Sequence, residues 1–248
     1  MAQLADKMPR IIPSTQDLQA WGAVWLGTQG SIRAGVQTTK EPNCFDKKQG
    51  MDFGNVFDMA FGRALAEMLG GIDVVEITAN GNLLPPQANC VEVGGARIIG
   101  GIRPQNFDAA YRPDGPRVVL DSKTLNDAKS IGKNWQNMVN DISTEAATIH
   151  TRFPYCLAVL IIAVPRPALM PKQERDLVRT LERLGSRDDV LDQDHLAEAI
   201  ALIVWDPATG NLDPNVPSAD SPIRLENVNT RIYDAYTKRY QGLPPHDD

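Results

Sequence analysis

The segment YCLAVLIIAV at residues 155–164 constrains the fold more than any other stretch of the sequence. It is a nearly unbroken aliphatic run, about half as long as the ~20 residues that a membrane-spanning helix needs. A short run rich in Val, Ile and Leu is typical of a strand that is buried on both faces, in the middle of a sheet. The chain must therefore supply a layer of structure on each side of this strand.

Strands and helices alternate around this segment. Helical periodicity covers residues 14–26, 51–71, 132–152, 171–185 and the end of the chain, and strand patterns cover residues 72–79, 155–164 and 197–206. The Gly- and Thr-rich stretch between the first two helices is expected to be a plain connection. This order predicts an α/β fold with a central mixed β-sheet flanked by helices. We expect a single domain over residues 1–248, with a core at about 51–165 and extensions at both ends.

Composition excludes several classes of protein. A net charge of −6 over 248 residues argues against an indiscriminate nucleic-acid coat, although it permits one locally basic cleft. Cys44, Cys90 and Cys156 are far apart and form no CxxC pair, so neither a zinc site nor a disulfide framework is expected. The longest apolar stretch is too short to cross a membrane. These features are typical of a cytoplasmic protein.

The segment RVVLDSK at residues 117–123 ends a buried strand pattern on two charges, Asp121 and Lys123. Burying a charge costs several kcal/mol or so unless a partner is supplied. The acid-x-Lys pattern also occurs at residues 46–48, in a segment expected to be a polar loop, and at 127–129, in a loop or helix start. Only Asp121-x-Lys123 follows a strand, which singles it out as a candidate site.

A turn brings a second acid to the same place. RPDG at residues 112–115 has Pro and Gly where a tight turn needs them, so the flanking segments are expected to pair as antiparallel strands. Asp108 then comes beside Asp121, and strand alternation places Asp121 and Lys123 on one face with Ser122 opposite. Two carboxylates, with water retained, are typical ligands of Mg²⁺, and a nearby lysine can orient a water or neutralise a phosphate. The alternative interpretation is a surface ion pair at strand ends.

An acid, a short turn and then Asp-x-Lys on the adjoining strand resembles the PD-(D/E)xK nuclease superfamily, which includes most type II restriction endonucleases. The resemblance covers roughly residues 51–165. It departs from the family pattern in having Phe107 before Asp108, and Gln136 followed by Asn140 in the next helix. The family also places an acid on a preceding helix, and Asp58 matches it better than Glu67, because Asp58 lies nearer the apolar face of its helix.

The resemblance implies a Mg²⁺-dependent endonuclease that cuts double-stranded DNA. Asp108 and Asp121 would be metal ligands, with Asp58 as a further one, and Lys123 would act on the attacking water or the phosphate. Because a duplex has two antiparallel strands, a two-fold homodimer is the simplest architecture. A structure-specific repair or recombination nuclease fits the same residues. A non-catalytic α/β interaction module is the alternative from another class.

Other residues are expected to lie outside the site. His150 and His195 have no ligand-spaced partner, so surface or capping roles are expected for both. Gln136 is expected to be a solvated helix residue.

Overall fold

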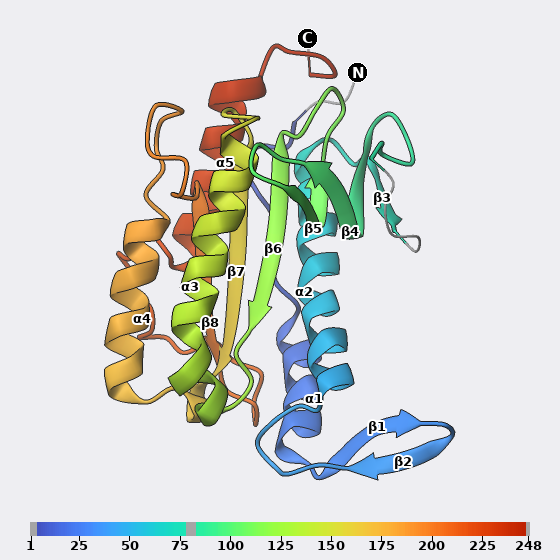
Figure 1. The fold of residues 1–248 in the computed structure, drawn as a ribbon, viewed down its shortest axis with the longest axis vertical. Coiled ribbons are helices and arrows are strands. Elements are labelled where there is room, and N and C mark those ends of the chain that lie inside the picture. The colour runs from blue at the N-terminus through green and yellow to red at the C-terminus, as the bar shows by residue number, and fades with distance from the viewer. Residues whose placement is uncertain (1–3, 78–82, 247–248) are drawn as a thin grey trace.

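A computed structural model describes residues 4–77 and 83–246 of the protein. Within these residues the centre is a six-stranded sheet in the order β3-β4-β5-β6-β7-β8 (Figure 1). Its strands are β3 (Asp73–Glu76), β4 (Cys90–Ile99), β5 (Pro104–Tyr111), β6 (Val118–Thr124), β7 (Leu157–Pro165) and β8 (Ala199–Trp205). β4–β5 and β5–β6 pair antiparallel, and the other neighbours pair in parallel. The predicted α/β fold with a central mixed sheet is confirmed.

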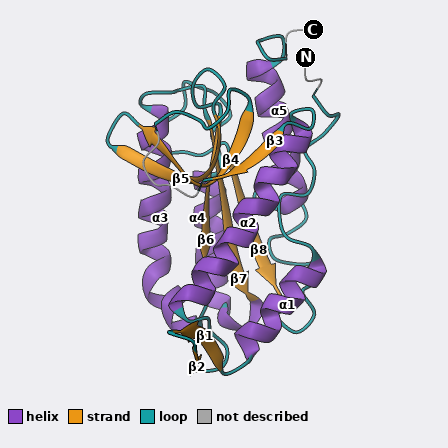
Figure 2. Ribbon diagram, turned by 90° about the vertical axis from the view of Figure 1, so that its right-hand side faces the viewer, coloured by secondary structure: helices purple, strands orange, loops and turns teal. Residues whose placement is uncertain are grey.

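Helices cover both faces of this sheet (Figure 2). The helices are α1 (Thr15–Leu26), α2 (Lys47–Met68), α3 (Ala128–His150), α4 (Pro171–Leu184) and α5 (Leu225–Tyr240), with a 3₁₀ turn, η1, at Arg166–Ala168. α2 and α5 pack on one face, while α3 and α4 pack on the other. None of the described helices is both long enough and apolar enough to cross a membrane.

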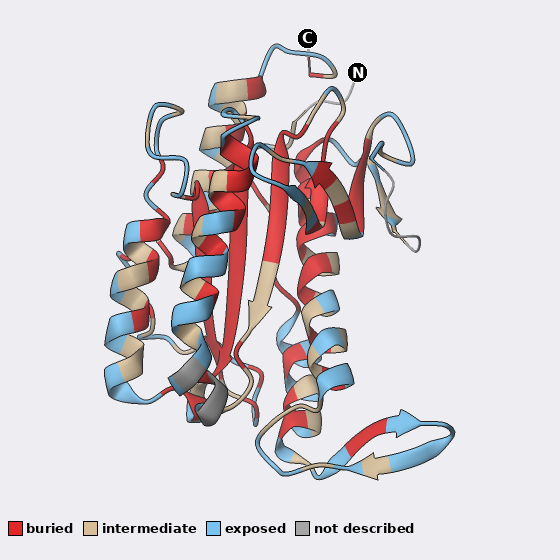
Figure 3. Ribbon diagram, in the orientation of Figure 1, coloured by how far each residue is buried: buried red, intermediate tan, exposed pale blue. Residues whose placement is uncertain are grey.

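Strands β7 and β8 confirm the prediction made from their apolar sequences. Every residue of both strands is buried (Figure 3). Alternate side chains face opposite cores: Val159 and Ile161 pack with α2 and α5, whereas Leu160 and Ile162 pack with α3 and α4. A central strand of a three-layer fold has no solvent-facing side, which explains the continuous aliphatic run.

The expected plain connection after α1 is wrong, because that stretch forms a β-hairpin. β1 (Gln29–Arg33) and β2 (Val36–Thr39) pair antiparallel through a two-residue loop. Ala34 and Gly35 both have positive φ, 49° and 79°, as a type I′ hairpin loop requires. An alanine seldom adopts this conformation, and the usual sequence signal of such a turn is Asn-Gly. The Ala-Gly pair at this position therefore gave no sign of a hairpin.

The expected polar loop at residues 46–48 is also wrong, because α2 begins there. Asp46 is the N-cap of α2: its carboxylate accepts from the backbone N–H of Gln49, and the Gln49 side chain accepts in return from the N–H of Asp46. Further along α2, a Cβ at Gly62 would lie 2.4 Å from Val93 Cγ2, so glycine lets the helix pack tightly on β4. This close packing holds the preceding turn of α2 against the sheet.

Candidate active site

The candidate site begins where β5 and β6 part. The strands pair as far as Ala109 and Leu120, so the next positions, Asp108 and Asp121, face each other across the ladder. The backbone N–H of Ser122 then donates to Asp108 Oδ2 at 2.8 Å. The Asp108 carboxylate therefore accepts the hydrogen bond that a backbone carbonyl of β5 would accept if the strand pairing continued. The two aspartates lie together, as the turn between the strands predicted.

Lys123 lies on the same face of β6 as Asp121 and contacts two acids. Its Nζ contacts Asp121 Oδ2 and lies 3.1 Å from Oε1 of Glu145, in α3. Burial lowers the pKa of Lys123, but the charges of Asp121 and Glu145 outweigh burial and raise that pKa above its ordinary value. Lys123 is therefore a fixed positive charge, and Ser122 faces the opposite side, near Gly54 of α2.

Glu145 is the site residue that the sequence reasoning missed. It is buried, and its Oε2 has no hydrogen-bond partner among the described residues. On α3 it lies within the buried apolar stripe that packs on the sheet, formed by Met138, Ile142, Ala146 and Ile149. A carboxylate in an apolar stripe was the available signal, because such a charge needs a partner from another element.

Asp58 reaches the site from α2, as its position on the helix predicted. Its residue exposure is 5%, and its Oδ1 has no hydrogen-bond partner among the described residues. Glu67, the alternative helix acid, is exposed on another side of α2. The structure thus brings Asp58, and not Glu67, to the two strand aspartates.

These carboxylates raise one another's pKa. Burial and the charge of Asp108 raise the pKa of Asp58 to about 8, against an ordinary 3.8. Burial and the charge of Asp121 raise the pKa of Asp108 to about 7, and burial with a hydrogen bond involving Glu145 raises the pKa of Asp121 to about 7. Negative charge here is only partly compensated by Lys123, which is a pattern typical of functional sites.

A cleft of about 750 Å³ opens over these groups. Asp58, Asp108, Ser122 and Lys123 line it, together with the N-terminal half of α2, the middle of α3 and the loop after β6. Its rim carries the amides Asn55, Asn134 and Asn137, which can donate hydrogen bonds to an anionic ligand. The acids therefore lie at a place that a substrate from solution can reach.

The residues present fit a hard divalent cation such as Mg²⁺. This ion takes one or two carboxylates and keeps several waters, and Asp108 and Asp121 supply such a pair. The free Oδ1 of Asp58 and the raised pKa values of all three acids reflect negative charge that a cation would compensate. No three or more His, Cys, Asp or Glu side chains of residues 4–77 and 83–246 form a preformed metal cage. Water would therefore complete the coordination shell.

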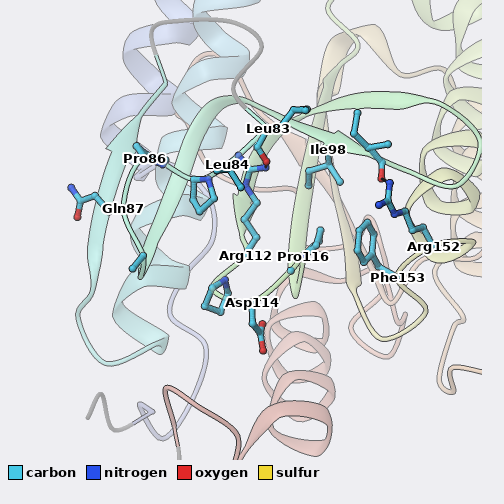
Figure 4. Close-up of a pocket in the computed structure, with 15 residues that line it drawn as sticks. Leu83, Leu84, Pro86, Gln87, Ile98, Arg112, Asp114, Pro116, Arg152 and Phe153 are labelled. Atoms are coloured by element: carbon cyan, nitrogen blue, oxygen red, sulfur yellow. Dashed lines mark hydrogen bonds between the residues drawn. The ribbon is translucent and has the colours of Figure 1, made fainter.

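A second hollow, of about 640 Å³, lies at the other end of β6 (Figure 4). Its walls are largely apolar, with Leu84, Ile98 and Phe153 among the lining residues. The guanidinium of Arg112 there forms an ion pair with Glu92 at 2.6 Å. Because its lining groups are mainly apolar or paired, this hollow is a weaker candidate for catalysis than the cleft.

The predictions for Gln136 and His150 have different outcomes. Gln136 is exposed, as expected for a solvated helix residue. His150 is not at the surface, so that prediction is wrong: it is buried, with Nε2 3.1 Å from Glu198 Oε2 and Nδ1 2.9 Å from the Asp194 carbonyl. The partner of His150 lies 48 positions away in the sequence, which is why local spacing gave no sign of it.

Comparisons of the chain with protein-family models, with curated proteins and with solved structures found no match. The resemblance to PD-(D/E)xK nucleases therefore depends on the residues and the geometry described above.

Proposed function

We propose that the protein is a Mg²⁺-dependent endonuclease that hydrolyses phosphodiester bonds of double-stranded DNA, as type II restriction endonucleases do. One observation carries the proposal. Asp108 on β5, Lys123 on β6 and Asp58 on α2 line one open cleft, and Asp121 lies beside it, in contact with Lys123 and opposite Asp108 on the adjoining strand. This is the arrangement that the family resemblance requires of these four residues.

The acids would bind the ion. Asp108 and Asp121 would be its ligands, and Asp58 would add a third carboxylate from the opposite wall. When bound, Mg²⁺ supplies positive charge to the phosphate oxygens and makes a water molecule more acidic. The remaining chemistry belongs to the side chains of the chain itself.

Lys123 would act on the water or on the phosphate. Its ammonium lies beside the metal-binding acids, where it can orient a water for attack or neutralise a phosphate oxygen. Glu145 would hold the ammonium at 3.1 Å while the Asp121 carboxylate is engaged by the ion. Asparagine amides at the rim would bind neighbouring phosphates, which positions the duplex without reading its sequence.

A duplex contains two antiparallel strands, and one cleft per chain treats one of them. We therefore propose that the protein acts as a two-fold homodimer. We also propose that it works in the cytoplasm, because its three cysteines are free.

The test is cleavage of supercoiled plasmid DNA by the purified protein, with Mg²⁺ and with EDTA. We expect cleavage with Mg²⁺ alone, and we expect none from the Asp121→Asn variant purified in the same way, which controls for a contaminating nuclease. Discrete bands would support a sequence-specific restriction endonuclease. Cleavage confined to branched or flapped duplexes would instead identify a structure-specific nuclease. If no DNA substrate is cut under any of these conditions, the proposal fails and the non-catalytic module is favoured.

A further inference from the structure

The β1–β2 hairpin projects from the body of the protein at the end where α2 begins (Figures 1 and 2). Within the described chain its two strands pair with each other and with no strand of the main sheet. The side chains of Ile32, Arg33 and Val36 at its tip are exposed. A projecting ribbon with uncovered strand edges and exposed apolar side chains is a surface ready for a partner.

The start and the middle of β1 are fixed to one wall of the cleft. The carboxylate of Asp46 accepts from the backbone N–H and the hydroxyl of Ser31, at 2.5 and 2.6 Å. The Gln49 side chain donates to the Gln29 carbonyl at 2.9 Å. Both anchors belong to the cap and first turn of α2, and Asp46 itself lines the cleft.

A second anchor joins the ribbon to the loop after β6. Lys40, at the end of β2, donates from Nζ to the carbonyls of Trp25, at 3.2 Å, and Gly27. The indole of Trp25 donates in turn to the Asn126 carbonyl at 2.6 Å, and Asn126 also lines the cleft. The direction of the ribbon is therefore set by the two elements that form the mouth of the cleft.

The charge of the ribbon favours an anionic partner. The chain has 31 acidic residues among 248, yet none lies between Asp17 and Glu41. Arg33 is exposed at the tip of the ribbon, and Lys47 is exposed at the rim of the cleft. In a protein of net charge −6, this acid-free segment, which carries Arg33 and Lys40, repels phosphate less than the chain does on average.

We propose that the β1–β2 ribbon enters the major groove of the duplex whose backbone lies in the cleft, and that it reads base pairs there. This inference rests on the proposed nuclease function. The major groove, roughly 12 Å wide, admits a two-stranded ribbon. The Arg33 guanidinium can bind a guanine edge with two hydrogen bonds, and the apolar Ile32 and Val36 can contact thymine methyl groups.

The mounting of the ribbon sets which base pairs it reaches. Asp46, its anchor, and Asp58, in the cleft, are twelve residues apart on α2, which corresponds to about 18 Å along a helix. At about 3.4 Å per base pair, this is roughly five base pairs. With α2 aligned along the axis of the duplex, the ribbon would read positions about five base pairs from the phosphate that is cut.

The experiment is cleavage of a duplex pool of randomised sequence, with the ends sequenced, by wild type and by Arg33→Ala, Arg33→Lys and Arg63→Ala. Arg63 is an exposed arginine of α2 outside the cleft lining, so its variant is matched in charge. We expect Arg33→Ala to lower discrimination at the positions about five base pairs from the cut, roughly 10- to 100-fold. Arg33→Lys should do the same, because a lysine lacks the two-pronged geometry, and Arg63→Ala should match wild type.

Several outcomes would overturn the proposal. If cutting continues and Arg33→Ala keeps the wild-type sequence profile, the ribbon does not read bases and the nuclease function stands. If Arg33→Ala slows cleavage equally at all sequences and Arg33→Lys restores the rate, Arg33 binds phosphate only. If Arg33→Ala changes the sedimentation of the protein but not its profile, the ribbon joins two copies of the chain. If wild type neither cuts nor binds any duplex in Mg²⁺, the proposed function itself fails and the ribbon proposal fails with it.

Discussion

Buried carboxylates have raised pKa values in the cleft, whereas the buried carboxylate of Glu198 has a lowered pKa. Glu198 lies just before β8, and its Oε1 accepts from Arg187 at 2.5 Å and from Arg239 at 2.9 Å. Its Oε2 accepts from the backbone N–H of Ala158 at 2.8 Å and lies 3.1 Å from His150 Nε2. Although burial raises the pKa of Glu198, these partners outweigh it and lower the pKa to about 2.

In the cleft the balance is reversed. Lys123 is the cation shared by four acids. It contacts Asp121 and Glu145, and its charge also acts on Asp58 and Asp108. The pKa of each of the three aspartates is nevertheless raised. An acid with several donors is stable by itself, and its removal leaves buried cations without a partner. Acids in excess of their donors are costly to hold together and need a further cation. This difference supports a structural role for the Glu198 cluster and the proposed metal-binding role for the cleft acids.

Asp121→Asn should have the largest effect on cleavage. The change removes a proposed ligand while relieving repulsion among the acids, so we expect cleavage to fall by roughly 10³-fold or more, with no loss of stability. Single-turnover cleavage and urea unfolding measure the two effects. Asp108→Asn should behave alike, and the double variant should lose little more than either one. Wild-type cleavage by folded Asp121→Asn would remove the catalytic role.

Lys123→Ala should separate chemistry from binding. The acids can still hold Mg²⁺, but the water or phosphate loses its cation, which typically slows a reaction by about 10²–10⁴-fold. Duplex affinity measured beside single-turnover cleavage tests this, and the affinity should be nearly unchanged. If Lys123 is only a structural partner of Asp121, the variant will cut at the wild-type rate.

Glu198→Gln should show the opposite behaviour. It leaves the buried Arg187 and Arg239 without a counter-charge, so we expect a loss of about 3–5 kcal/mol in the free energy of unfolding. Cleavage per folded molecule should stay unchanged, because Glu198 does not line the cleft. Unfolding in urea and an active-site-normalised rate provide the two measurements. Intact stability with lost cleavage would contradict the division between the clusters.

The two clusters should also give stability opposite slopes with pH. The three cleft aspartates have pKa values of about 7 to 8 in the folded protein, against an ordinary 3.8. Between these two pH values the folded protein therefore binds more protons than the unfolded chain does. Their contribution to stability is present below pH 3.8 and is lost as pH rises through 7 to 8. Glu198, with a pKa of about 2 against 4.5, contributes above pH 4.5 and loses its contribution as pH falls through 2.

Mg²⁺ should change the pH dependence of stability that comes from the cleft aspartates. At an ion concentration of 100 Kd we expect a gain of about 2.7 kcal/mol at pH 8, where the cleft acids are ionised, and much less at pH 5. Urea unfolding with Mg²⁺ and with EDTA at both pH values is the measurement. An equal effect at pH 5 and pH 8 would place the bound ion outside the cleft.

The smallest effect distinguishes the two helix acids. Asp58→Ala should slow cleavage by roughly 10- to 100-fold, because Asp58 supports the Asp108 and Asp121 pair from α2. Glu67→Ala, at an exposed position of the same helix, should change stability by no more than about 0.5 kcal/mol and leave cleavage alone. Rates measured over a range of Mg²⁺ concentrations compare them. The reverse ranking would mean that Asp58 takes no part in the site.

Much of the site could be predicted because its signals are local. The RPDG segment predicted that its flanking strands pair antiparallel, and with strand alternation this pairing places Asp108, Asp121 and Lys123 together. The connection itself is longer than the predicted tight turn, because it runs from residue 112 to residue 117. Helix periodicity likewise turned Asp58 toward the sheet and Glu67 toward solvent. These residues needed no knowledge of how distant segments pack.

Other residues were out of reach for the opposite reason. Glu145 meets Lys123 only because α3 packs across β6, and the two residues are 22 positions apart. The burial of His150 could not be predicted, because its partner Glu198 is brought to it only by the pairing of β7 with β8. The hairpin after α1 was missed because its turn uses Ala34 and Gly35, and Asp46 from α2 holds the middle of β1.

The layers of the fold and the pairing of the strand acids follow from the sequence alone, because periodicity and turn chemistry act between neighbours in the chain. The tertiary structure alone decided which charges are compensated. Asp121, in β6, and Glu198, just before β8, are both buried carboxylates, and no local pattern distinguishes them. The difference comes from what packs on each: two arginines and a histidine around Glu198, and three further acids near Asp121. A charge buried in a low-dielectric interior responds to every partner within a few ångströms, wherever that partner lies in the chain.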